Sequence, residues 1–103
     1  MARLCLLAED GAVSEFWEIG KEPVAVGRDD TADVAIDDET LSRRHFMIVR
    51  EGEGYLLKDL NSQNGTWVAG RRAEPQGEKL GHNKCILAGR TLFLFSEHQS
   101  SQA

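Results

Sequence analysis

Four chemically active side chains stand together in the sequence: Ser42, Arg43, Arg44 and His45. A hydroxyl and an imidazole three residues apart can serve as a nucleophile and its base. Two guanidinium groups can bind an anion. The cluster directly precedes the apolar run FMIV, which is typical of a strand. Three interpretations are therefore open: a catalytic centre, an anion-binding site, or a solvated turn.

Catalysis and metal binding lack the further residues that they require. No GxSxG elbow surrounds Ser42, and nothing in the sequence indicates a third triad member or an oxyanion hole. The three histidines, at positions 45, 82 and 98, lie far apart, and no Cys/His pair has zinc-ligand spacing. The acidic run at 29–39 lacks the glycine and glutamate of an EF-hand loop, so we interpret it as solvated turns. We therefore expect no enzyme, no metal site and no cofactor.

Composition restricts the other classes of function. The 103 residues are 41% hydrophobic and carry a formal net charge of −5, which suits one small soluble domain and disfavours nucleic-acid binding. No apolar run approaches the roughly 20 residues that span a bilayer. The apolar stretch at 4–8 is too short for a signal-peptide core, so we expect a cytoplasmic protein with no membrane partner. Cys5 and Cys85 stand in apolar surroundings, and we expect two reduced core thiols.

Short β-branched and aromatic runs separated by turn residues predict an all-β fold. Residues 91–95, TLFLF, predict a strand that is buried on both faces, and no window has a helical stripe of three turns. We expect residues 1–96 to form one domain and the polar residues 97–103 to form a tail or the start of a linker in a larger protein. Nine strands are predicted, at 3–8, 14–19, 23–27, 33–36, 44–50, 54–59, 66–72, 84–88 and 91–96.

Two other short motifs flank the cluster. Gly27 and Arg28 follow an apolar strand, and Asn64-Gly65 precedes the strand that begins at Thr66. Each motif alone indicates only a tight turn, because glycine and asparagine tolerate positive φ.

In order, however, the chain contains Gly27-Arg28, then Ser42-Arg43-Arg44-His45, then Ser62-Gln63-Asn64-Gly65-Thr66, then Gly70. This series resembles the forkhead-associated (FHA) domain family over about residues 3 to 96. The resemblance implies an 11-stranded antiparallel β-sandwich of two twisted sheets, with ligand-binding loops at 28–33, 37–43 and 60–65. Two strands beyond the predicted nine are then expected from a break of 66–72 at Gly70 and from the region 73–83.

The resemblance also implies a ligand and roles for individual residues. The ligand would be a phosphothreonine-containing peptide or protein, marked by a Ser/Thr kinase. The residues that would bind it are Arg28, Ser42, Arg43, Gln63 and Asn64, although Gln63 departs from the Thr, Ser, Lys or Arg that the family commonly has there. The residues that would support the site structurally are Gly27, His45, Gly65 and Thr66, whereas Arg44 would point away from the site or to its rim.

The physical chemistry of these side chains suits that ligand. A phosphothreonine carries a charge of about −1.5 to −2 and three strong acceptor oxygens. A guanidinium at position 28 offers a fork to two of them, and the Asn64 amide can both donate to and accept from a peptide backbone. Acidic neighbours (Asp29, Asp30, Asp38 and Glu39) would weaken phosphate attraction or select basic residues beside the phosphothreonine.

Besides a small hydrolase built on Ser42 and His45, which the missing triad member and oxyanion hole disfavour, two hypotheses of different classes remain. The first is a phosphothreonine-dependent adaptor, expected to be a monomeric module. The second is a phosphate-independent assembly or dimerisation domain that uses its sheet faces. The first is favoured because sheet-face binding would not require Arg28, Ser42 and Asn64 together.

Overall fold

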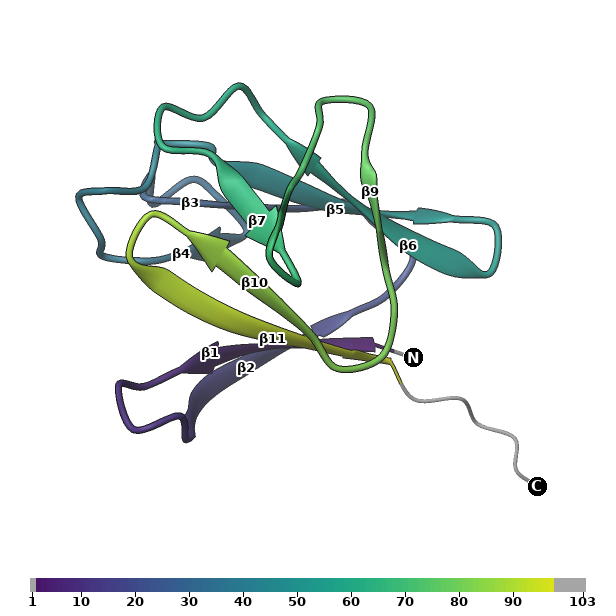
Figure 1. The fold of residues 1–103 in the computed structure, drawn as a ribbon, viewed down its shortest axis with the longest axis horizontal. Coiled ribbons are helices and arrows are strands. Elements are labelled where there is room, and N and C mark those ends of the chain that lie inside the picture. The colour runs from purple at the N-terminus through teal and green to yellow at the C-terminus, as the bar shows by residue number, and fades with distance from the viewer. Residues whose placement is uncertain (1, 98–103) are drawn as a thin grey trace.

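The computed structural model describes residues 2–97, and these form a sandwich of two β-sheets without a helix (Figure 1). One sheet has the strand order β2-β1-β11-β10-β7-β8 and the other has the order β4-β3-β5-β6-β9. Within this described range the eleven strands are β1 (Ala2–Leu7), β2 (Val13–Ile19), β3 (Val24–Gly27), β4 (Val34–Ala35), β5 (Phe46–Glu51), β6 (Gly54–Asp59), β7 (Thr66–Val68), β8 (Arg71–Arg72), β9 (Glu78–Leu80), β10 (Lys84–Ala88) and β11 (Thr91–Glu97).

The core lies between the two sheets, because strand residues alternate between an inner and an outer face. In β5, Phe46 and Ile48 are fully buried, and in β11 Phe93 and Phe95 are fully buried opposite them. The Phe46 and Phe93 rings meet edge to face, with their centroids 5.6 Å apart. This aromatic contact joins the two sheets next to the loop that follows β4, because Phe46 comes directly after the last residue of that loop.

The predicted fold class is confirmed, and so are the two extra strands. The run 66–72 breaks into β7 and β8 at Ala69 and Gly70, which both have positive φ (50° and 85°). The region 73–83 supplies β9. One pair departs from the antiparallel expectation: β3 and β4 are parallel, because the chain crosses over between them through residues 28–33.

Two expectations about burial are wrong. Leu92 in β11 is 45% exposed, so this strand is buried on its inner face and only partly covered on its outer face. Cys85 in β10 is exposed, whereas Cys5 in β1 is buried as expected, and both thiols are free. The physical reason is the same, since Leu92 and Cys85 lie on the outer face of the six-stranded sheet, which faces solvent in this part of the chain.

The loops after β3, β4 and β6 gather at one end of the sandwich, at the left and upper left in Figure 1. The backbone N–H of Arg28 donates to the carbonyl of Ser42 (3.0 Å), so the loops after β3 and β4 lie side by side. The chain then passes from β6 in one sheet to β7 in the other through residues 60–65. At the opposite end, Ala2 and Glu97 are partners in the β1–β11 ladder. Residues 98–103, most of the expected tail, lie outside the described residues.

Candidate functional site

A polar groove of about 480 Å³ lies across the gathered loops. It brings together every side chain that the sequence predicted to bind ligand. The lining residues are Arg28, Glu39, Thr40, Leu41, Ser42, Arg43, Arg44, Gln63 and Asn64. Three guanidinium groups face one carboxylate here, so the groove is locally positive in a chain whose net charge is −5.

Arg28 follows directly from the last residue of β3, Gly27. A Cβ at position 27 would overlap the carbonyl oxygen of Arg43 and lie 2.9 Å from the Cα of Arg44, so only glycine lets these backbones approach so closely. The Nε of Arg28 donates to the carbonyl of Leu41 (3.0 Å). Its two terminal nitrogens have no hydrogen-bond partner among residues 2–97, which leaves a planar fork for two oxygens of an anion.

The hydroxyl of Ser42 is set up to donate. Its oxygen accepts a hydrogen bond from the backbone N–H of Gln63 (3.0 Å). Because that bond uses a lone pair and leaves the hydroxyl hydrogen free, the hydrogen can be given to an anion in the groove. The same bond ties the loop after β4 to the loop after β6.

His45 lies beneath Ser42 and is fully buried. Its Nδ1 accepts the backbone N–H of Ser42 (3.0 Å), so the ring proton sits on Nε2, which donates to the carbonyl of Gly65 (2.8 Å). His45 therefore joins the loop after β4 to the loop after β6 from inside the protein and does not line the groove.

The loop at 60–65 is shaped by Asp59. Its carboxylate accepts the hydroxyls of Ser62 (2.6 Å) and Thr66 (2.7 Å) and the backbone N–H of Ser62 (2.9 Å). Burial raises the pKa of Asp59, but the hydrogen bonds from Ser62 and Thr66 leave this pKa below its ordinary value. The Ser62 hydroxyl oxygen in turn accepts the N–H of Gly65 (2.9 Å), which has a φ of +82°.

Asn64 stands at the end of this loop with its amide across the groove. Its Nδ2 donates to the carbonyl of Thr40 (2.7 Å). In the described part of the chain its Oδ1 has no partner, so it can accept an N–H from a bound peptide. Gln63, Arg43 and Arg44 also line the groove, and Nη2 of Arg44 reaches the carbonyl of Thr31 (3.5 Å).

The prediction that the acidic run forms only solvated turns is wrong for two residues. Asp33 accepts the backbone N–H of Ala25 (2.8 Å), and Asp38 accepts the N–H and hydroxyl of Thr40 (2.8 and 2.6 Å). The Asp-x-Thr spacing at 38–40 is typical of an Asx turn, and it could have indicated the second case. The carbonyls of Thr40 and Leu41, which hold Asn64 and Arg28, have no counterpart in a sequence motif.

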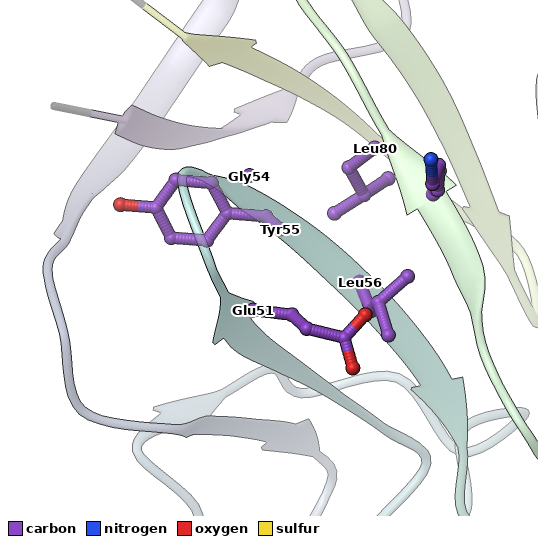
Figure 2. Close-up of a pocket in the computed structure, with 6 residues that line it drawn as sticks. Glu51, Gly54, Tyr55, Leu56 and Leu80 are labelled. Carbon is purple, nitrogen blue, oxygen red and sulfur yellow. The ribbon is translucent and has the colours of Figure 1, made fainter.

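A second pocket, of about 240 Å³, lies at the hairpin of β5 and β6 against β9 (Figure 2). Figure 2 shows the ring of Tyr55 and the carboxylate of Glu51 pointing in different directions. The Tyr55 hydroxyl is occupied, because it donates to the carbonyl of Ile19 (3.3 Å). Lys79 supplies one cation, so this pocket lacks the convergent donors of the loop groove.

A β-sandwich whose end loops converge on a polar groove has the arrangement of a binding module. Comparison with known proteins agrees, since the family model described as the FHA domain matches residues 24–89. The chain belongs to the FHA domain family. Members of this family are binding modules, as the resemblance in the motifs implied.

Individual relatives extend the match over most of the fold. The FHA domain of the CT664 protein from Chlamydia trachomatis has a TM-score of 0.88 and 30% identity, over 95% of this chain and 98% of that one. A structure from a study of phosphothreonine-dependent FHA domain interactions has a TM-score of 0.84 and 28% identity, over 95% and 97%. An oxoglutarate dehydrogenase inhibitor of Corynebacterium jeikeium is 42% identical over 50 residues, which cover 48% of this chain and 35% of that protein.

The chain spans about a third to a half of the length of several curated relatives that it matches. Residues 2–97 lack two features that other classes of protein have. No group of three or more His, Cys, Asp or Glu side chains is arranged to hold a metal ion. Likewise, these residues contain no helix that is long and apolar enough to cross a membrane.

Proposed function

We propose that this domain binds phosphothreonine in a partner protein and thereby recruits that partner. The observation that carries the proposal is the free donor set of the groove, in which the Arg28 fork and the Ser42 hydroxyl both lack an internal acceptor among the described residues. Asn64 adds an amide that can hold the peptide backbone beside the phosphate. Similarity to the structure from the phosphothreonine-dependent study, at 28% identity, supports this ligand.

Several finer features of the partner belong to the same proposal. A Ser/Thr kinase would create the ligand, and the module would act as a monomer without catalysing a reaction. It would work in the cytoplasm and bind neither nucleic acid nor membranes, in keeping with the net charge of −5. The positive groove on an acidic molecule favours a small, compact anion over an extended polyanion.

The central experiment compares phosphorylated and plain threonine peptides. A library of phosphothreonine peptides with varied flanking residues selects the tightest sequence, and fluorescence anisotropy then measures Kd for both forms of that peptide. Arg28→Ala should weaken binding of the phosphorylated form by about 3 kcal/mol, or more than a hundredfold, because two charge-assisted hydrogen bonds are lost. Its thermal midpoint should hardly move, since the side chain is exposed.

Arg50→Ala is the matched control, because Arg50 carries the same charge at the β5–β6 hairpin, away from the groove. Its Kd should equal that of the wild type. Equal affinity for phosphorylated and plain peptides would reject the proposal.

That rejection would favour the second hypothesis, assembly through a sheet face. One observation supports it: Phe16, Leu87 and Leu92 expose 50%, 38% and 45% of their surface on the outer face of the six-stranded sheet. Sedimentation of the wild type and of Leu92→Ser measures whether this face joins two molecules.

A further inference from the structure

Arg28 and Asn64 reach the groove from different loops, and both side chains are held by one short backbone segment, Thr40-Leu41. The carbonyl of Thr40 accepts the Asn64 amide (2.7 Å), and the carbonyl of Leu41 accepts the Arg28 Nε (3.0 Å). Leu41 itself is 2% exposed, so its side chain is fixed in the core. The direction of these two carbonyls therefore sets where the Arg28 fork and the Asn64 amide point.

This segment is in turn tied to the turn between β10 and β11, in the other sheet. Asp38 Oδ1 accepts the N–H and the hydroxyl of Thr40 (2.8 and 2.6 Å), while Oδ2 accepts the hydroxyl of Thr91 (2.6 Å) and the N–H of Arg90 (3.3 Å). The Thr40 hydroxyl oxygen also accepts the N–H of Arg90 (2.9 Å). A Cβ at position 89 would strike Thr40, so the turn packs directly against the segment.

The carboxylate at the centre of this network is ionised at neutral pH. Burial raises the pKa of Asp38, but hydrogen bonds from the hydroxyls of Thr40 and Thr91 and the backbone of Thr40 and Arg90 lower it to about 2. An ionised oxygen makes shorter and stronger hydrogen bonds than a neutral one, which suits a group that must hold two loops in register.

We propose that Asp38 and Thr91 are positioning residues of the phosphothreonine site, which fix the Thr40-Leu41 carbonyls and through them Arg28 and Asn64. The inference rests on the proposed function. Neither Asp38 nor Thr91 lines the groove, so both act on the ligand only through other residues. The turn between β10 and β11 thus becomes part of the recognition site, although it lies about 50 residues further along the chain.

Simple electrostatics makes the opposite prediction for Asp38. A negative charge near the groove repels a phosphate, so its removal should strengthen binding if charge alone matters. Loss of positioning should weaken binding, because the donors no longer meet the phosphate oxygens in one geometry. The sign of the change in affinity therefore separates the two effects.

The experiment measures Kd for the phosphothreonine peptide selected from the library. We expect Asp38→Asn to bind at least about tenfold more weakly and Thr91→Val about fivefold more weakly, the size of effect seen when a contact acts through intermediates. Thr91→Ser keeps the hydroxyl and should restore wild-type affinity within about twofold. Asp37→Asn, the matched control, removes the same charge from an exposed neighbour and should bind as the wild type does or slightly more tightly.

Unchanged or tighter binding by Asp38→Asn, or wild-type affinity in Thr91→Val, would overturn the inference. A loss that Thr91→Ser does not restore would overturn it as well.

A second readout needs no ligand. Solvent exchange of the Arg28 Nε–H and of the Asn64 side-chain amide, followed by NMR in the free protein, should be faster in Thr91→Val than in the wild type. The backbone amides of β5 should stay equally protected, which shows that the variant is folded. If the wild type binds no phosphothreonine peptide, the proposed function fails, yet this measurement still decides the inference: unchanged exchange at both side chains refutes it.

Discussion

Two aspartates hold the two loops of the site with the same chemistry and different reach. Asp59 accepts two hydroxyls and one backbone N–H, all from residues within seven positions of it. Asp38 accepts two hydroxyls and two backbone N–H groups, but two of these four hydrogen bonds come from Arg90 and Thr91, more than 50 residues away where β11 begins. The Asp59 carboxylate bonds residues of the loop that directly follows it, whereas the Asp38 carboxylate connects its loop to the other sheet.

The comparison of Asp59 with Asp38 shows that one loop is held by a neighbour in the sequence and the other by a distant strand pair. The carboxylate that shapes the loop at 60–65 comes from Asp59, directly before the loop in the sequence. The loop at 36–45 depends on a hairpin of the other sheet, so its geometry follows the assembly of the whole sandwich. His45 joins the two loops, because its ring bonds Ser42 on one and Gly65 on the other.

The largest expected effect is that of removing this link. His45→Ala leaves a cavity and two unsatisfied backbone groups, so it should lower the free energy of unfolding by about 3 kcal/mol. Urea unfolding measures the change, and His82→Ala, which removes an exposed ring that accepts the N–H of Glu97 (3.2 Å), should cost about 1 kcal/mol. Equal stability of the two variants would show that the loops do not need the buried ring.

A smaller loss is expected at the local anchor. Asp59→Ala removes the acceptor of two hydroxyls, and the Thr66 residue is fully buried, so the free energy of unfolding should fall by about 2 kcal/mol. Asp37→Ala at an exposed position is the control for loss of charge and should be nearly neutral. A nearly neutral Asp59→Ala would mean that the loop keeps its shape without the carboxylate.

The smallest expected effect is the contribution of Asp38 to the loss of folding stability at low pH. Because the folded-state pKa of Asp38 is about 2 and its ordinary value is 3.8, its contribution to stability is complete above pH 4 and is lost as the pH falls toward 2. Asp38→Asn cannot titrate, so its stability should fall less than that of the wild type between pH 4 and pH 2. Chemical denaturation across this interval measures the difference, and parallel curves for the two proteins would contradict the lowered pKa.

The sequence predicts the strands well because alternation and turn residues are local properties. Ala69 and Gly70 mark the break between β7 and β8 at the position where the motif resemblance predicted it. The exposure of Leu92 could not be predicted, since an apolar side chain has the same sequence pattern whether or not another layer covers it. The length and net charge of the chain also do not predict that the outer face of the six-stranded sheet is exposed.

The site was predictable only in part. Resemblance to the family drew attention to Arg28, Ser42 and Asn64, and the structure places all three in one groove. Periodicity alone could not bring their loops together, because successive loops of a plain meander fall at opposite ends. The bond between Asp38 and Thr91 spans 53 residues, and no local pattern connects positions so far apart.

The pairing of Ala2 with Glu97 has a practical consequence for protein engineering. Since these two positions are neighbours in one ladder, and the loops that line the groove gather at the other end of the sandwich, a fused fluorescent protein or surface tether at either position would leave the groove open (Figure 1). The same proximity makes the domain suitable for insertion into a surface turn of a host protein, where both junctions must meet at nearly one point.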